Sequence, residues 1–380
     1  MSSNATMIRI ACFLALFLPG MVAQAIEQPI DRLIEQAAGP HPVGFRVQQQ
    51  AEGRKPQQIL SWYPAAAAGR TLRYADYLAT RLTALRNDRS ADELQTLRRQ
   101  QANRLAQRLG PAAQTLLEAP MQASWNAPPA AGAFPVIVYA PGVGGPADEN
   151  AELLEYLASH GYVVLSSVGM GADGKDVEDN LASVEPQVAD LRALIRLAEA
   201  NPQADARRLA LLGWSWGGMT HLFAATQEAQ VQALISLDGT REPALTQLID
   251  VKRLTAPWLY VSRTPDTITQ LNRRGIDTRF SLLNEARHSP VTQLIAYPLR
   301  HEDFVSRRLR EAPPTAYDEY SQAEVRQAFG MVALYVRHFL DAHLKRAAAS
   351  AAFLARKPVE NGAQPHSLRL ELNGSLAPQP

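Results

Sequence analysis

The chain has 380 residues, 46% of them hydrophobic, and a formal net charge of +1 at pH 7. This length suits one large α/β domain with an insertion or two small domains, and the apolar fraction is ordinary for a protein with a sizeable core. A near-neutral chain without a basic stripe is not typical of nucleic-acid binding, so we expect no nucleic-acid partner.

The N-terminus has the pattern of a secretory signal peptide. An apolar run over residues 10–18 follows Arg9 and precedes a small-residue sequence that ends at Ala25. This pattern predicts a signal peptide over residues 1–25. An uncleaved anchor is the alternative, but the run is shorter than the roughly 20 residues of a spanning helix. We expect an exported protein, periplasmic or secreted, with no stable membrane span after cleavage. Because the only cysteine, Cys12, would be removed, we expect no disulfide, thiolate metal site or cysteine nucleophile.

Residues 26–346 are expected to form one folded domain, in which a short helix and a turn over residues 26–42 precede two strands over residues 43–49 and 58–63. Residues 72–118 differ, because Arg, Gln, Leu and Ala recur there at helical spacing. This spacing predicts an insertion of two or three amphipathic helices. The insertion fits two roles, a cover over one edge or face of a sheet and a cap over a substrate pocket. Residues 347–380 are rich in alanine and then in proline and polar residues, which predicts a weakly ordered tail.

A series of apolar, β-branched runs predicts the main sheet. The runs alternate with stretches of helical spacing, as expected for parallel strands joined by helices. Such a sheet is doubly wound, mostly parallel and covered on both faces. The runs lie at residues 134–140, 161–166, 209–213, 231–237, 258–262 and 291–296.

The most informative local motif is Gly213-Trp214-Ser215-Trp216-Gly217, which fits the Gly-x-Ser-x-Gly pattern of a nucleophile elbow. An apolar run leads into it and a helix-compatible run leaves it, as the motif requires. The turn would expose the serine hydroxyl and place the Trp216 N–H at a helix N-terminus, where it can stabilise an oxyanion. The alternative is a glycine-rich turn with an ordinary serine, since the pattern alone is common.

A second glycine-rich loop, Pro141-Gly142-Val143-Gly144-Gly145, follows the predicted strand over residues 134–140. A phosphate cradle would need Gly-Lys-Ser/Thr, which is absent. The loop better fits the other half of an oxyanion hole, with the Val143 N–H as its donor.

An activated serine needs a base, and the base needs an orienting acid. Two acids follow successive strands after the elbow, Asp238 and Asp266, and both are compatible with that role. His301 follows the last predicted strand, whereas His288 precedes it on a segment that looks like a solvated helix. The chain order serine, acid, histidine is the one expected with a nucleophile elbow.

Several of these stretches resemble the platelet-activating factor acetylhydrolase group of α/β-hydrolases. The resemblance lies in residues 62–64, 125–129, 134–144, 157–164 and the elbow. The C-terminal segment 339–344 is also similar to dienelactone-hydrolase-like proteins, which use a cysteine nucleophile that is absent here. The resemblance implies an α/β-hydrolase fold whose helical insertion precedes the oxyanion-loop strand.

The resemblance also implies a triad of Ser215, Asp238 and His301, with Asp266 as the alternative acid. The preference for Asp238 rests on this resemblance, because that group takes its acid directly after the strand that follows the elbow. Two departures stand out. Pro141 replaces a histidine that commonly buttresses the oxyanion loop, and tryptophans flank the serine where His and Phe are usual.

Together these features predict an exported serine hydrolase that cleaves carboxylic esters and needs no metal or organic cofactor. Its substrate is expected to be a small-molecule or lipid ester. Acyl transfer or amide cleavage by the same triad, and a non-catalytic binding protein on a hydrolase scaffold, are the alternatives.

Overall fold

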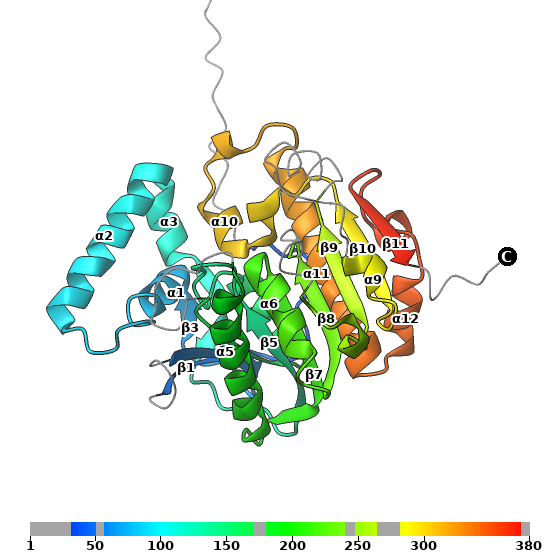
Figure 1. The fold of residues 1–380 in the computed structure, drawn as a ribbon. Coiled ribbons are helices and arrows are strands. Elements are labelled where there is room, and N and C mark those ends of the chain that lie inside the picture. The colour runs from blue at the N-terminus through cyan, green and yellow to red at the C-terminus, as the bar shows by residue number, and fades with distance from the viewer. Residues whose placement is uncertain (1–31, 51–56, 170–179, 240–247, 264–281, 374–380) are drawn as a thin grey trace, which may run out of the picture.

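The computed structural model describes residues 32–50, 57–169, 180–239, 248–263 and 282–373 (Figure 1). The expected signal peptide and residues 264–281, which include the alternative acid Asp266, lie outside these ranges.

A single sheet of eleven strands runs through the described part of the chain, in the order β11-β10-β9-β8-β7-β5-β6-β2-β1-β4-β3. The six strands from β6 to β10 in this order are parallel to one another. Antiparallel strands β2 and β11 flank them, so the sheet is mostly parallel, as predicted. The strands are β1 (Val43–Gln50), β2 (Gln57–Pro64), β3 (Thr71–Arg73), β4 (Pro120–Trp125), β5 (Phe134–Ala140), β6 (Val163–Ser167), β7 (Ala204–Trp214), β8 (Val231–Leu237), β9 (Trp258–Ser262), β10 (Val291–Ala296) and β11 (Leu368–Asn373).

The sheet is buried on both faces, which explains why its central strands are apolar without interruption. In β5, Ile137 and Tyr139 point into one core while Val136 and Val138 point into the other. Helices α4 (Ala151–Ser159) and α11 (Gln322–Leu344) cover the first face. Helices α5 (Leu181–Glu199) and α6 (Trp216–Ala225) cover the second, in front of the sheet in Figure 1.

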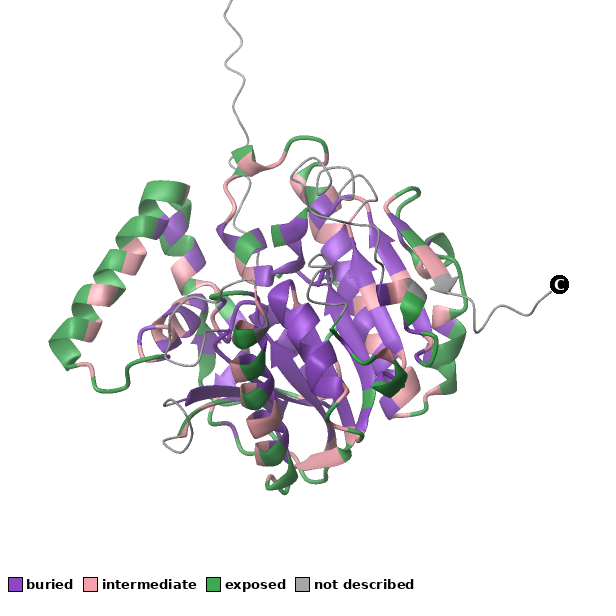
Figure 2. Ribbon diagram, viewed as in Figure 1, coloured by how far each residue is buried: buried purple, intermediate pink, exposed green. Residues whose placement is uncertain are grey.

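Helices α1 (Tyr74–Thr80), α2 (Ala91–Leu109) and α3 (Ala112–Glu118) occupy the region of the expected insertion. They lie beside the sheet edge that β3 and β4 form, and α2 projects from the body with most of its surface exposed (Figure 2). Only Leu105 is buried among the residues of α2. The Arg108 guanidinium and the Tyr74 hydroxyl both reach Glu311 of α10 (Ser306–Glu311). The insertion is therefore tied to the body of the domain through charged contacts.

The expectation of a weakly ordered C-terminal tail was wrong for residues 348–373. They form α12 (Ala348–Leu354) and β11, which pairs antiparallel with β10 and buries Leu368. Alanine is the strongest helix former, and leucine recurs at every second position in β11. The composition of the whole segment, on which the expectation rested, does not reveal these two local patterns.

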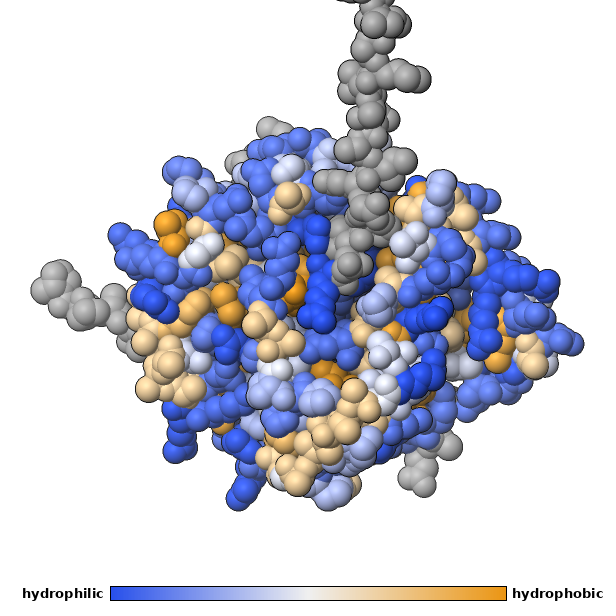
Figure 3. Space-filling model, turned by 180° about the vertical axis from the view of Figure 1, so that it is seen from behind, coloured by the Kyte–Doolittle hydropathy of each residue, from blue (hydrophilic) through white to orange (hydrophobic). Residues whose placement is uncertain are grey.

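The other short elements connect these parts of the domain. They are α9 (Leu282–Glu285) and the 3-10 helices η1 (Val251–Arg253), η2 (His301–Phe304), η3 (Pro314–Ala316) and η4 (Pro358–Asn361). The face seen in Figure 3 is mostly hydrophilic, with apolar side chains scattered over it. Among the described helices, none is long and apolar enough to cross a membrane.

Candidate active site

Ser215 lies at the sharp turn between β7 and α6, with φ 53° and ψ −122°. This left-handed backbone conformation is strained for a residue with a side chain. The Ser215 N–H donates to the Leu237 carbonyl at 3.0 Å, which fixes the turn against β8. A Cβ on Gly217 would lie 2.0 Å from the Ala140 carbonyl oxygen, so only glycine fits there. The motif has the elbow geometry that places a serine side chain at the carboxyl edge of a sheet.

Ser215, His301 and Asp238 form a continuous chain of hydrogen bonds. The Ser215 Oγ lies 2.8 Å from His301 Nε2, and His301 Nδ1 lies 2.6 Å from Asp238 Oδ2. All three residues are buried, each no more than 8% exposed. Asp238 follows β8, and His301 begins η2 shortly after β10. A neutral imidazole held in this way accepts the serine proton at Nε2 while the carboxylate fixes its tautomer.

Asp238 also contacts a cation that no sequence motif indicated. Arg263, the residue after β9, has its Nε 2.5 Å from Asp238 Oδ2 and its backbone N 3.5 Å from Oδ1. The guanidinium therefore shares the carboxylate oxygen that receives the His301 N–H. Its only sequence signal is its place as the first charged residue after a predicted strand, three positions before Asp266.

The two elbow tryptophans have different surroundings. The Trp214 indole Nε1 donates to the His301 carbonyl at 2.9 Å, and the two rings lie 5.0 Å apart. Trp214 therefore holds the backbone of the candidate base. Trp216 is 5% exposed and packs into the core on the α5 and α6 side of the sheet. Among the described residues, its indole Nε1 has no hydrogen-bond partner.

The two candidate oxyanion donors leave the sheet from neighbouring strands. Ala140 of β5 pairs with Gly213 of β7, so the loop of Val143 and the elbow start side by side. Val143 is 52% exposed, and no described residue accepts a hydrogen bond from its N–H. Trp216 is the first residue of α6, where helix N–H groups lack internal partners and the helix dipole favours negative charge.

A buried carboxylate, also missed from the sequence, lies beneath the Val143 loop. Glu149 accepts hydrogen bonds from the Gly142 N–H and the Tyr139 hydroxyl. Burial raises the pKa of the Glu149 carboxyl from 4.5 to about 7, and these two donors oppose part of that rise. Its sequence signal was indirect: a loop without its usual histidine needs another support.

Two other histidines, His221 and His288, lie in different surroundings. Burial lowers the pKa of the His221 imidazole from 6.5 to about 3, so it is neutral beneath the elbow helix. Its Nδ1 lies 3.1 Å from the Gly217 carbonyl and its Nε2 lies 3.3 Å from Ser236 Oγ. His288 is exposed, as its solvated helix-like segment indicated.

No group of three or more potential metal ligands occurs in the described ranges.

Comparison with known proteins supports the fold. A model of the chlorophyllase family matches residues 103–252, which contain Ser215 and Asp238. The structure of a ferulic acid esterase from Streptomyces cinnamoneus is similar over 91% of this chain and 100% of its own, with a TM-score of 0.56 and 18% sequence identity. No curated protein sequence matches the chain. The chain has the α/β-hydrolase fold that the sequence predicted.

Proposed function

We propose that the protein is a serine hydrolase that cleaves carboxylic esters. The observation that carries this proposal is the hydrogen-bonded chain of Ser215, His301 and Asp238 on a nucleophile elbow. The choice of an ester bond is supported by the structural similarity to an esterase.

The geometry assigns each residue a step. Ser215 Oγ attacks the ester carbonyl as His301 Nε2 takes its proton, and the N–H groups of Val143 and Trp216 stabilise the resulting oxyanion. His301 then gives the proton to the leaving alcohol as the ester C–O bond breaks, so the alcohol departs and the acyl group stays on Ser215 Oγ as an acyl-enzyme. Water deprotonated by His301 hydrolyses that intermediate and restores Ser215. Asp238 holds the imidazole and stabilises its cation throughout.

Turnover of p-nitrophenyl acetate tests the reaction class. We expect the wild-type protein to release p-nitrophenol and the Ser215→Ala variant to lose this activity by at least about 10³-fold. A folded wild-type protein without turnover on short esters would contradict ester hydrolysis. Ligand binding without turnover would instead support the binding-protein alternative.

We further propose that the substrate is a small-molecule or lipid ester of the platelet-activating factor type. The motifs shared with that acetylhydrolase group favour this class. A panel of esters graded by acyl length, with an acetyl phospholipid included, tests it. Fastest turnover of acetyl esters is expected, whereas a preference for long acyl chains would contradict it. Product analysis with added alcohol or amine acceptors separates hydrolysis from acyl transfer, and an amide panel tests amide cleavage.

Export is a separate proposal that rests on residues 1–25. The intact mass of the protein recovered from the periplasm or the culture medium tests it. We expect a chain that begins at Ile26. Retention of the full chain inside the cell would contradict export.

A further inference from the structure

The loop that carries Val143 needs support that its own sequence does not supply. An oxyanion donor is effective only when its N–H is held in the direction of the developing charge. Pro141, where a buttressing histidine is usual, has neither a backbone N–H nor a polar side chain. Something else must therefore fix this loop.

Glu149 supplies that support from below. Its Oε1 accepts the Gly142 N–H at 2.9 Å and the Tyr139 hydroxyl at 2.8 Å. Its Oε2 lies against the loop, because a Cβ on Gly145 would be 2.2 Å from it. The residue is only 1% exposed. The carboxylate therefore contacts the loop on both sides of Val143 and is shielded from water.

The opposite side of Gly142 is held by the elbow. A Cβ on Gly142 would lie 2.5 Å from the Trp214 ring, so the ring lies directly against this residue. The same indole donates to the His301 carbonyl. The Gly142 peptide is therefore clamped between Glu149 and the tryptophan that holds the candidate base.

The far end of the loop is fixed as well. Gly144 N–H donates to the Gly169 carbonyl, and Gly169 N–H donates to the Gly145 carbonyl, both at 2.9 Å. Gly145 N–H closes a turn onto the Gly142 carbonyl at 2.9 Å. The Val143 N–H belongs to the peptide that joins Gly142 to Val143, and the carbonyl of that peptide accepts the Gly145 N–H. The peptide before it carries the Gly142 N–H and is held by Glu149. The direction of the Val143 N–H therefore depends on how these two successive peptides are held.

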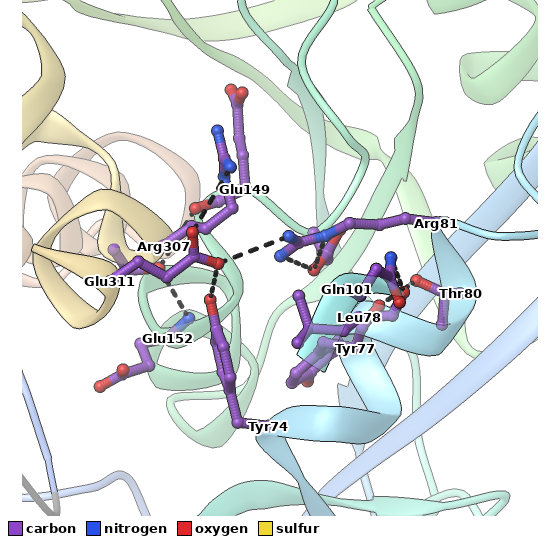
Figure 4. A network of polar contacts seen from close by, with 12 residues as sticks. Tyr74, Tyr77, Leu78, Thr80, Arg81, Gln101, Glu149, Glu152, Arg307 and Glu311 are labelled. Atoms are coloured by element: carbon purple, nitrogen blue, oxygen red, sulfur yellow. Dashed lines mark hydrogen bonds and ion pairs between the residues drawn. The ribbon is translucent and has the colours of Figure 1, made fainter. Parts of the chain in front are cut away.

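The turn that carries Glu149 is itself rigid. The Arg307 N–H donates to the Glu149 carbonyl at 3.0 Å. The carboxylate of the preceding residue, Asp148, accepts a hydrogen bond from the Arg81 guanidinium at 2.7 Å. Figure 4 shows Glu149 beside Arg307 and Glu311, with Arg81 reaching across from the end of α1. The turn that carries the Glu149 carboxylate is thus anchored by contacts with α10 and with the helical insertion.

We propose that Glu149 is the positioning residue of the oxyanion loop. By accepting the Gly142 N–H it sets the direction of the Val143 N–H and takes the place of the absent histidine. This inference rests on the proposed ester hydrolysis.

Three substitutions at this position test the inference. Glu149→Leu removes the acceptor, and we expect kcat on p-nitrophenyl acetate to fall about 10- to 100-fold with KM within about 3-fold of wild type. Glu149→Gln keeps an acceptor oxygen of the same reach and should restore kcat to within about 5-fold of wild type. Glu149→Asp keeps a carboxyl group, but its side chain is one methylene shorter and does not reach the Gly142 N–H. We therefore expect its kcat to fall as well, so this variant tests the inference if the leucine variant does not fold.

Glu155 offers a matched control on α4, the helix that follows the turn of Glu149. It is 2% exposed and accepts hydrogen bonds from the Tyr77 hydroxyl and from the N–H groups of Gln122 and Ala123. Like Glu149, it is a buried acid that accepts hydrogen bonds from a tyrosine hydroxyl and from backbone N–H groups. The Glu155 contacts, however, fix β4 and not the loop of Val143. Glu155→Leu should lower thermal stability and leave kcat within about 3-fold of wild type.

Two kinds of result would overturn the inference in an active wild-type enzyme. One is an unchanged kcat in folded Glu149→Leu and Glu149→Asp. The other is an equal loss of kcat in the leucine and glutamine variants, or in Glu149→Leu and Glu155→Leu. A wild-type protein that neither turns over esters nor reacts with a fluorophosphonate at Ser215 would instead contradict the proposed function.

Discussion

Two of the three candidate catalytic residues have left-handed backbone conformations. Ser215 has φ 53° and Asp238 has φ 50°, and such conformations cost roughly 1–3 kcal/mol each outside glycine. The neighbouring strands hold them in place, because Ser215 N–H donates to Leu237 and Asp238 N–H donates to the Val261 carbonyl at 2.7 Å. At the scale of the residue, the sheet maintains a strained geometry that points the hydroxyl and the carboxylate at His301.

The identity of the acid gives the first prediction. Asp238→Asn should lower kcat by about 10³- to 10⁴-fold, because an amide N–H facing Nδ1 favours the wrong imidazole tautomer. Asp266→Asn, made in parallel, should keep kcat within about 3-fold of wild type. Steady-state kinetics on one short ester decides between them. The opposite order of effects would make Asp266 the acid.

Arg263 gives the second prediction, because its charge faces the same carboxylate as the imidazole. Its guanidinium lies against Asp238 Oδ2, the oxygen that receives the His301 N–H, and helps to hold that carboxylate in place. In Arg263→Gln, we expect kcat on a short ester to fall about 3- to 30-fold, because the carboxylate that orients the imidazole would lose its charged partner. Steady-state kinetics of the variant and the wild-type protein measure this effect. An unchanged kcat would show that the guanidinium does not act on the triad.

At the scale of the element, α6 is supported by polar contacts with β8 beneath it. Ser236 Oγ donates to the Gly218 carbonyl at 2.9 Å and receives the Trp258 indole N–H at 3.0 Å. His221 lies in the same network, completely buried. These contacts hold the first turn of the elbow helix, where the Trp216 N–H must stay in place.

His221 makes stability depend on pH. Burial lowers the pKa of its imidazole in the folded state to about 3 from an ordinary value of 6.5. In the unfolded chain the imidazole binds a proton below pH 6.5. Its contribution to the free energy of unfolding is therefore full above pH 6.5 and falls by ~1.4 kcal/mol per pH unit toward pH 3.

Urea unfolding of wild type and His221→Asn at several pH values from 7 to 4 measures this effect, because other titrating groups are common to both proteins. We expect the wild-type protein to lose more stability than the variant as the pH falls. Parallel curves would mean that the imidazole is protonated in the folded state as readily as in the unfolded chain.

The sequence predicted the parallel strands, the elbow and the three residues that the structure brings together, because these signals are local. Apolar runs mark buried strands, and Ser215 stands in a short motif. The choice of Asp238 also required the resemblance to a known family, because a position after a strand left Asp266 equally possible. Arg263 and Glu149 were missed because no spacing shows which way a side chain turns. Glu149 is only seven residues from Gly142, yet its contact depends on how the chain turns between β5 and α4.

At the scale of the whole molecule, the C-terminal segment completes the sheet and the core. β11 pairs with all six residues of β10. Phe353 of α12 stacks on His338 with the rings 3.8 Å apart and contacts the Tyr335 ring at 5.1 Å. Residues 348–373 thus belong to the folded domain.

Deleting residues 347–380 should therefore destabilise the domain. Phe353 and Leu368 are 6% and 7% exposed, and exposing two such side chains costs about 3–6 kcal/mol. The edge of β10 would also lose its partner strand. Thermal unfolding of the truncated protein should show a lower midpoint than that of the full chain. Equal midpoints for the long deletion and the intact domain would contradict this role.

The most direct test of the central claim is covalent labelling of Ser215 by a fluorophosphonate. We expect the intact mass of the wild-type protein to rise by one phosphonyl group, with the label mapped to the peptide of Ser215 and esterase activity lost in step. Ser215→Ala should not react, and His301→Ala should react at least about 10²-fold more slowly, because the serine loses its base. A folded wild-type protein that stays unlabelled, or that carries the label on another residue, would contradict a triad centred on Ser215.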